Sequence, residues 1–186
     1  MPTWAWIIIA AAAALVVLAA IAAAWARKRR SGGLRERFGP EYERTVAERG
    51  KRSEAEGELA ERERKREKVD IVPLSPQSRQ QYGDAWRNVQ ARFVDDPGGT
   101  VGDADRLVTD VMRERGYPID DFDQRAADVS VDHPEVVENY RAAHSIYVTH
   151  ERGNADTEEL RQAFVHYRAL FEELLEERVP ASQGAR

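Results

Sequence analysis

The chain has 186 residues, of which 33% are charged, a formal net charge of −5 at pH 7, and no cysteine. The lack of cysteine excludes disulfides, thiolate metal sites, cysteine nucleophiles and lipid attachment to cysteine. Residues 73–186 carry 13 Lys and Arg against 22 Asp and Glu. This acidic excess disfavours nucleic acid as a partner, because it repels the phosphate backbone.

The N-terminal segment, residues 1–30, predicts a membrane anchor. Residues 4–26 carry no charge, and four basic residues follow them at positions 27–30. At about 1.5 Å per residue, a helix of that length spans a hydrocarbon core of about 30 Å. We therefore expect residues 4–26 to lie in the lipid bilayer of the cell membrane. The positive-inside rule places the N-terminus outside and the C-terminal domain in the cytoplasm. The alternative is export with a cleaved signal, which the length of the run and the lack of a basic residue before it disfavour.

Residues 31–74 predict a charged helical stalk and an extended linker to the next domain. Up to residue 72 they hold 11 basic and 11 acidic side chains. Opposite charges recur at helical spacing, as in Glu58 and Arg62, and each such pair is worth about 0.2–0.5 kcal/mol. The sparse apolar positions favour a solvated helix over residues 34–68. A coiled-coil arm that joins two copies of the chain into a homo-oligomer is the alternative.

Residues 75–178 predict a helical bundle domain, and residues 179–186 a flexible tail. Ser75 followed by Pro76 is typical of a helix start, and Asp156 with Glu159 resembles a capping box. Apolar positions at helical spacing predict four long helices, at 76–93, 100–115, about 134–152 and 157–178, and a short helix at 121–129. The predicted fold is all-α: an antiparallel four-helix bundle with one extra short helix. The aromatic residues of these helices lie on the predicted inner faces: Tyr82, Trp86, Phe93, Phe122, Tyr140, Tyr147, Phe164, Tyr167 and Phe171.

The sequence predicts no catalytic residue, no cofactor and no metal site. The four histidines fit neither the metalloprotease spacing nor the Glu-x-x-His pattern of di-iron bundles. Ten Asp lie between residues 95 and 132, but they lack the layout of a calcium loop. Residues 97–102 are rich in glycine and predict a loop, without the lysine of a phosphate-binding loop. His144 and His166 are expected to meet in the bundle as a polar pair, with metal or proton binding as a hypothesis.

Four residues in the turns of the bundle are candidates for an interaction surface. Tyr117, Pro118 and Phe122 follow the second long helix, and His133 precedes the third. Aromatic residues are favoured at interfaces, so we expect these turns to contact another protein. The alternative for Tyr117 and Phe122, favoured for Phe122, is that they pack the short helix against the bundle. The predicted function is a membrane-tethered adaptor or scaffold. The alternatives are a ligand- or metal-binding sensor bundle and an enzyme of unrecognised type.

Four strings resemble an uncharacterised family of bacterial single-pass membrane proteins, often described as hypothetical or secreted. They are RFGPEY at residues 37–42, QARFVDDP at 90–97, MRERGYP at 112–118 and VDHPEVV at 131–137. The resemblance spans about residues 35–175. The family carries no assigned activity, so the resemblance implies no site residues.

Overall fold

The computed structural model describes residues 3–176, with side chains for residues 15–26 and 28–176. Within this range the chain forms helices and no strand, which confirms the all-α fold class. The eight helices are α1 (Thr3–Phe38), α2 (Pro40–Arg49), α3 (Arg52–Arg66), α4 (Pro76–Arg92), α5 (Pro97–Arg115), α6 (Phe122–Asp132), α7 (Val137–Glu151) and α8 (Thr157–Leu175). The predicted tail at residues 179–186 lies outside the described residues.

Backbone packing divides the chain into two units, residues 1–37 and residues 38–186. The first unit is the helix α1, whose backbone is helical throughout the described part of the predicted anchor. The side chains of residues 1–14 lie outside the described part of the chain. Among the residues that are described, no helix meets the length and apolarity of a membrane span.

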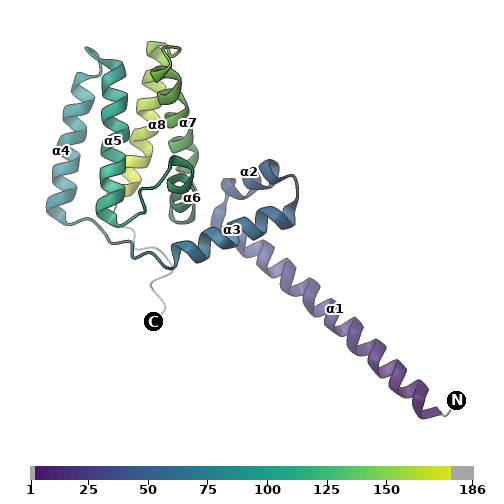
Figure 1. Ribbon diagram of the computed structural model, residues 1–186. Coiled ribbons are helices and arrows are strands. Elements are labelled where there is room, and N and C mark those ends of the chain that lie inside the picture. Colours follow the sequence, from purple (N-terminus) through teal and green to yellow (C-terminus); the bar gives the residue numbers. More distant parts are fainter. Residues whose placement is uncertain (1–2, 177–186) are drawn as a thin grey trace. The chain divides into compact units, whose positions relative to one another are not determined.

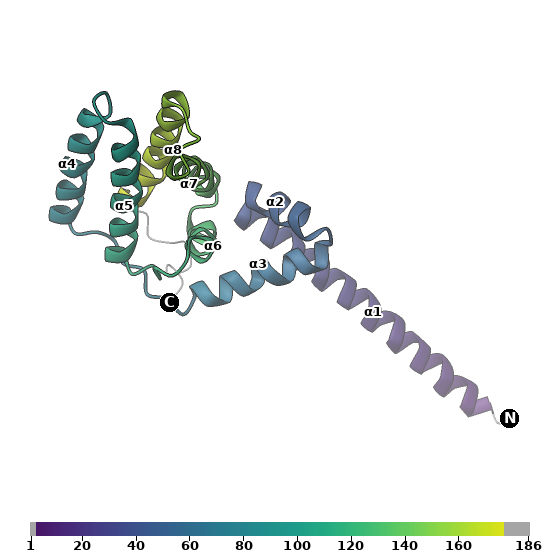
Figure 2. The same cartoon turned by 45° about the horizontal axis from the view of Figure 1, so that its top comes forward.

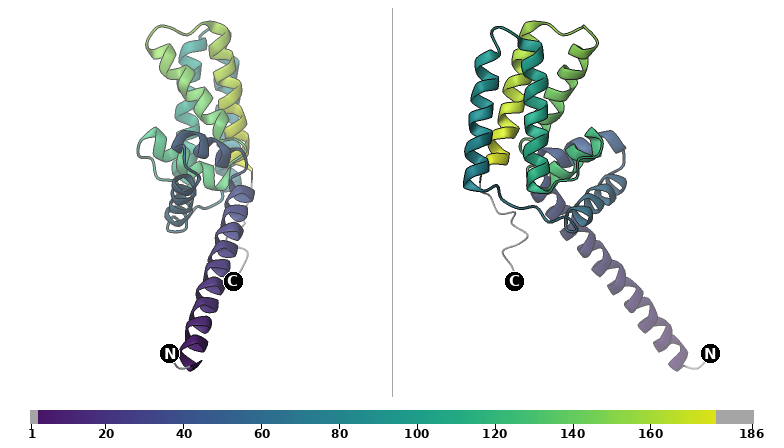
Figure 3. Two further views of the ribbon diagram at one scale, coloured as in Figure 1. Left: turned by 90° about the vertical axis from the view of Figure 1, so that its right-hand side faces the viewer. Right: turned by 60° about the vertical axis from the view of Figure 1, so that its left-hand side comes forward.

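Four long helices, α4, α5, α7 and α8, form the bundle of the second unit (Figure 1). Helix α5 packs against α8, while α4 lies beside α5 and α7 beside α8. The α4–α5 and α7–α8 loops lie at the same end of the bundle (Figures 1 and 3), so α5 and α8 run in the same direction. The predicted antiparallel packing therefore holds for the pairs α4–α5 and α7–α8 but is wrong for the neighbours α5 and α8, which no short loop connects. The predicted short extra helix is α6, which follows α5.

The helix ends follow the local chemistry of the sequence. The Ser75 side chain accepts a hydrogen bond from the Ser78 amide at the start of α4. Asp156 and Glu159 form both halves of a capping box at α8, as predicted. The loop predicted at residues 97–102 is wrong. Asp96 caps α5 by accepting from the Gly99 amide, and Pro97 occupies the first turn, where its missing N–H costs no hydrogen bond.

The predicted inner-face aromatic residues do line the bundle core. All nine are either buried or packed against the contiguous hydrophobic core. Trp86 on α4 stacks on Phe164 and Phe171 of α8, with ring centroids 4.9 and 4.4 Å apart. On the other side of α8, the Tyr167 ring meets the edge of Tyr140 on α7 at 6.3 Å. These contacts fix α4 and α7 against α8.

Residues 38–66 form a helical hairpin, so the solvated helix predicted over residues 34–68 is wrong. Helix α2 ends at Gly50, whose φ of 70° lies in the left-handed region that glycine adopts readily. The chain reverses there, and α3 packs back on α2 and beside α6 (Figure 2). Tyr42 and Leu59 are at most 1% exposed. The few apolar side chains of this segment are therefore buried by the reversal.

Candidate functional site

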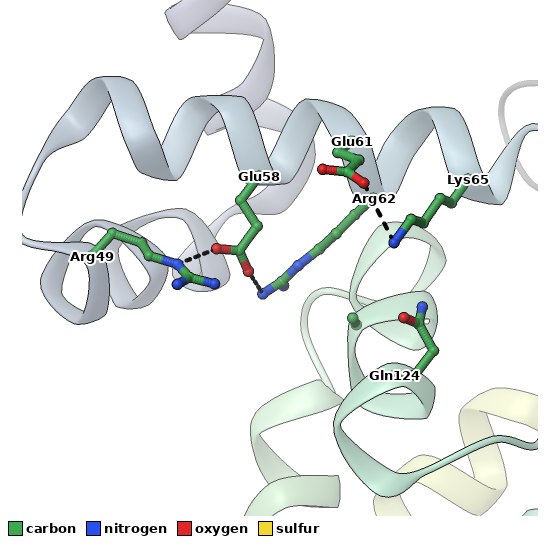
Figure 4. A pocket seen from close by; sticks show the side chains of 7 residues that line it. Arg49, Glu58, Glu61, Arg62, Lys65 and Gln124 are labelled. Atoms are coloured by element: carbon green, nitrogen blue, oxygen red, sulfur yellow. Dashed lines mark hydrogen bonds and ion pairs between the residues drawn. The ribbon is translucent and has the colours of Figure 1, made fainter.

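A cleft of about 220 Å³ opens between α3 and α6, and charged side chains line it. Figure 4 shows Arg49 and Arg62 pointing at Glu58 from opposite sides. Arg62 Nη2 donates to Glu58 Oε1 at 2.6 Å, and Arg49 Nε donates to the other carboxylate oxygen. Further along α3, Lys65 pairs with Glu61 at 3.5 Å. Helix α6 completes the lining with Gln124 and Ala127.

Arg62 connects the cleft to a buried carboxylate, that of Glu41. Glu41 lies in the first turn of α2 and is 1% exposed. Arg62 Nη1 donates to Glu41 Oε1 at 2.6 Å. Arg141 of α7 grips the same carboxylate through two nitrogens, at 2.6 and 2.8 Å. One carboxylate thus ties together α2, α3 and α7, in the bidentate geometry that arginine favours.

The two arginines keep the buried Glu41 carboxylate ionised. Burial by itself raises the pKa of Glu41, since it penalises the charged form. The hydrogen bonds and charges of Arg141, and then of Arg62, outweigh burial and hold the pKa below its ordinary value. Charges at helical spacing predict the pair of Glu58 and Arg62, which is present but partly buried, with side chains 23% and 13% exposed. The sequence contains no signal for the contacts of Glu41.

The turns predicted as an interaction surface turn out to be largely buried. Tyr117 is 3% exposed, and its hydroxyl donates to Asp132 Oδ2 at 2.9 Å. Burial, followed by the Asp132 charge, raises the pKa of Tyr117. His133 is 5% exposed, with Nδ1 3.2 Å from Glu173 Oε1. The prediction of accessible contacts is therefore wrong for these two residues, because the chain folds both turns back onto the bundle.

The other two candidates of that surface, Pro118 and Phe122, are half-buried. Phe122 stacks on the His144 ring with centroids 3.7 Å apart. It packs α6 against α7, and it does so beside Tyr140. Neither residue is exposed enough to anchor a partner on its own.

The two histidines of the predicted polar pair have different partners. His144 Nδ1 lies 4.0 Å from Asp105 Oδ1, and that oxygen also accepts the Tyr167 hydroxyl at 2.8 Å. His166 Nδ1 lies 2.8 Å from Asn139 Oδ1. Across the described residues, no group of three His, Cys, Asp or Glu side chains is placed to hold a metal ion. Sequence spacing placed both histidines on bundle helices but could not assign their partners.

We expect the free energy of unfolding to fall as the pH drops below about 6.5. Burial lowers the pKa of His133 and of His144, so the unfolded chain takes up these protons first. Above the pKa that these histidines have in the unfolded chain, both are neutral in the folded and in the unfolded state, and they do not change the free energy of unfolding. Below that pKa, stability is lost by at most about 1.4 kcal/mol per pH unit for each histidine. Urea unfolding of the full chain in detergent, between pH 7.5 and 5, measures this slope.

His133→Gln is the matched variant for this measurement. It removes one titrating group and keeps a side chain that can donate to Glu173, so the slope becomes shallower. An equal slope in the variant and the parent chain would assign the acid sensitivity to other groups.

The α3–α6 cleft is the best candidate site because its walls carry both signs of charge within one concave surface. The basic side chains of the cleft face Glu58 and Glu61; they are Arg49, Arg62 and Lys65. Arg62 is also fixed by its ion pair with the buried Glu41, which Arg141 holds in turn. Such a surface suits ion pairs and hydrogen bonds with a ligand of mixed charge. Comparisons with known protein families, curated proteins and solved structures find no match to this chain.

Proposed function

We propose that this protein is a membrane-tethered adaptor that binds another protein through the α3–α6 cleft. The observation that carries the proposal is the cleft itself, a concave and charged surface whose Arg62 is fixed by the buried Glu41. A fixed arginine loses less side-chain entropy on binding than a free one. The cleft is therefore preorganised for a partner with alternating charges.

The proposed anchor is the uncharged run of residues 4–26, followed by the basic residues 27–30. Residues 4–14 of this run have no described side chains. From Leu15 to Trp25, the large apolar side chains of α1 are 56–69% exposed. A contiguous apolar surface of this kind favours a lipid or protein environment over water. The proposed topology puts residues 31–186 in the cytoplasm, on the side of the basic cluster.

The proposed partner surface follows from the charges of the cleft. Glu58 and Glu61 offer acceptors to a partner arginine or lysine. Lys65, whose side chain is 55% exposed, offers a donor to a carboxylate. Exposed pairs contribute little affinity each but set orientation and association rate. We therefore expect salt-sensitive binding.

A photo-reactive residue in place of Lys65 tests the proposal in the full chain, in native membranes washed at alkaline pH. We expect a reproducible crosslinked protein at this position. The matched control is the same residue at Val165, which is 51% exposed on α8. An identical crosslinking pattern at the two positions would contradict the cleft as the binding site. Recovery of the chain in the wash, instead of in the membranes, would contradict the anchor.

A further inference from the structure

The hairpin, residues 38–66, buries its own apolar side chains apart from the bundle core. Tyr42, Ala55 and Leu59 are each at most 1% exposed. The contiguous core of the bundle includes buried residues from Ile71 to Leu174 but none of the described residues of the hairpin. The hairpin is therefore a small module with a separate core, and the continuity of the bundle core does not depend on it.

The side chains that join the hairpin to the bundle are mostly charged. Arg44 of α2 pairs with Glu138 of α7 at 2.8 Å. Arg62 of α3 donates to the Ser130 hydroxyl of α6 at 3.2 Å. A third contact of this joint is the ion pair between Arg66 of α3 and Asp132, the last residue of α6. Ionic contacts of this kind have a large desolvation cost and are sensitive to the loss of one partner.

Glu41 is the buried centre of this joint, since its carboxylate is held by Arg62 of the hairpin and Arg141 of the bundle. Glu138 likewise pairs with Arg44 of the hairpin and Arg141 of the bundle, but its side chain is 47% exposed. Without the Glu41 charge, Arg62 keeps its pair with Glu58 and Arg141 keeps its pair with Glu138. The two arginines then face each other across the joint with side chains only 13% and 16% exposed and no carboxylate between them. Two guanidinium groups in such a site repel each other, and neither regains full hydration unless the joint opens.

We propose that the hairpin is a releasable cover on the α6–α7 face of the bundle, held closed by the Glu41 carboxylate. On release, the hairpin keeps its own core and the bundle stays folded. Release uncovers Ser130, which is fully buried in the closed state, together with Arg141, whose side chain is 16% exposed. It also dismantles the α3–α6 cleft, because the cleft has one wall on each module.

The chain has the connections that such a motion requires. Gly39, with a φ of 47°, precedes α2 and lets the backbone adopt a turn that other residues rarely adopt. At the other end, a non-helical connector runs from residue 67 to residue 75. Ile71 and Leu74 are buried in the bundle core and the Val72 amide donates to Arg115 O, so the part that can act as a hinge is residues 67–70. This inference rests on the contacts of the hairpin and holds whether or not the proposed partner exists. If the partner does bind the cleft, it favours the closed state, since a ligand stabilises the state to which it binds.

Hydrogen–deuterium exchange of the full chain in detergent tests the inference with Glu41→Gln. We expect amides of α2 and α3 to exchange about tenfold to a hundredfold faster than in the parent chain, with α5 and α8 unchanged. Arg141→Gln removes the other side of the pair and should give the same pattern. The matched control is Glu158→Gln, which removes an exposed pair with Arg161 on α8 and should leave the hairpin unchanged.

Two outcomes would overturn the inference. Equal acceleration of the hairpin and the bundle, including complete unfolding of the variants, would mean that the two modules form one cooperative unit. Unchanged exchange of α2 and α3 in both Glu41→Gln and Arg141→Gln would mean that the ion pairs do not hold the hairpin.

Discussion

Replacing Trp86 by alanine is expected to lower the free energy of unfolding by about 3–5 kcal/mol. Trp86 is 5% exposed, and its ring stacks on both Phe164 and Phe171. Among the described residues its ring nitrogen has no hydrogen-bond partner, so the substitution removes packing alone. The substitution leaves a cavity between α4 and α8, where the remaining aromatic contact is the tilted pair of Phe93 and Phe164, with ring centroids 5.4 Å apart. Urea unfolding of the full chain in detergent, followed by circular dichroism at 222 nm, measures the loss.

Two further substitutions serve as controls for the free-energy change of Trp86→Ala. Val165→Ala removes an apolar side chain that is 51% exposed, and we expect a change within about 0.5 kcal/mol. Trp86→Phe keeps an aromatic ring between Phe164 and Phe171 and should recover most of the loss. A cost below about 1 kcal/mol for Trp86→Ala would contradict the packing of α4 on α8 through this stack.

The bundle could be predicted from the sequence because its signals are local and periodic. The spacing of Leu160, Phe164, Tyr167 and Phe171 predicts one buried face, and all four are buried. Its capping box is a short-range pattern that requires no tertiary contact. Where the loops are short, the order of neighbouring helices follows as well.

The hairpin could not be predicted because its stabilising contacts are distant in sequence. Tyr42 and Leu59 belong to two short apolar stripes of a charged segment, and only the reversal at Gly50 brings α2 and α3 together. The hydroxyl of Tyr42 then donates to Glu56 at 2.8 Å. Phe38, Tyr42 and Val46 repeat every four residues, as do Ala55 and Leu59, but these stripes are too short to predict that the two helices pack on each other.

The candidate site was missed for a related reason. A carboxylate such as Glu41 is exposed in most helices, and only tertiary contact with Arg141, 100 residues away, makes its burial favourable. Tyr117 and His133, by contrast, were predicted to be at the surface but are buried. Turn composition indicates a surface position, but the amide of Tyr117 donates to Met112 at the end of α5 and folds the ring inward. Burial of a turn depends on what covers it, which the local sequence does not contain.

Replacing Tyr167 by alanine is expected to cost about 3–5 kcal/mol, as large as the Trp86 effect. Tyr167 is fully buried on α8, its hydroxyl donates to Asp105 on α5 at 2.8 Å, and its ring contacts Tyr140 on α7. One side chain therefore joins three helices. Burial, reinforced by the Asp105 charge, raises the pKa of Tyr167, which remains a neutral donor throughout the working pH range. The same urea unfolding measurement applies.

A double-mutant cycle separates the ring of Tyr167 from its hydroxyl. Tyr167→Phe keeps the ring and should cost only about 0.5–1.5 kcal/mol, the net value of one hydrogen bond. Asp105→Ala leaves the hydroxyl buried without its acceptor and should cost more, about 1–3 kcal/mol. In the double variant no donor is left unpaired, so its cost should be smaller than the sum of the two single costs. Strict additivity would show that the Tyr167 hydroxyl and the Asp105 carboxylate do not interact. The contact between α5 and α8 would then be stabilised by apolar packing alone.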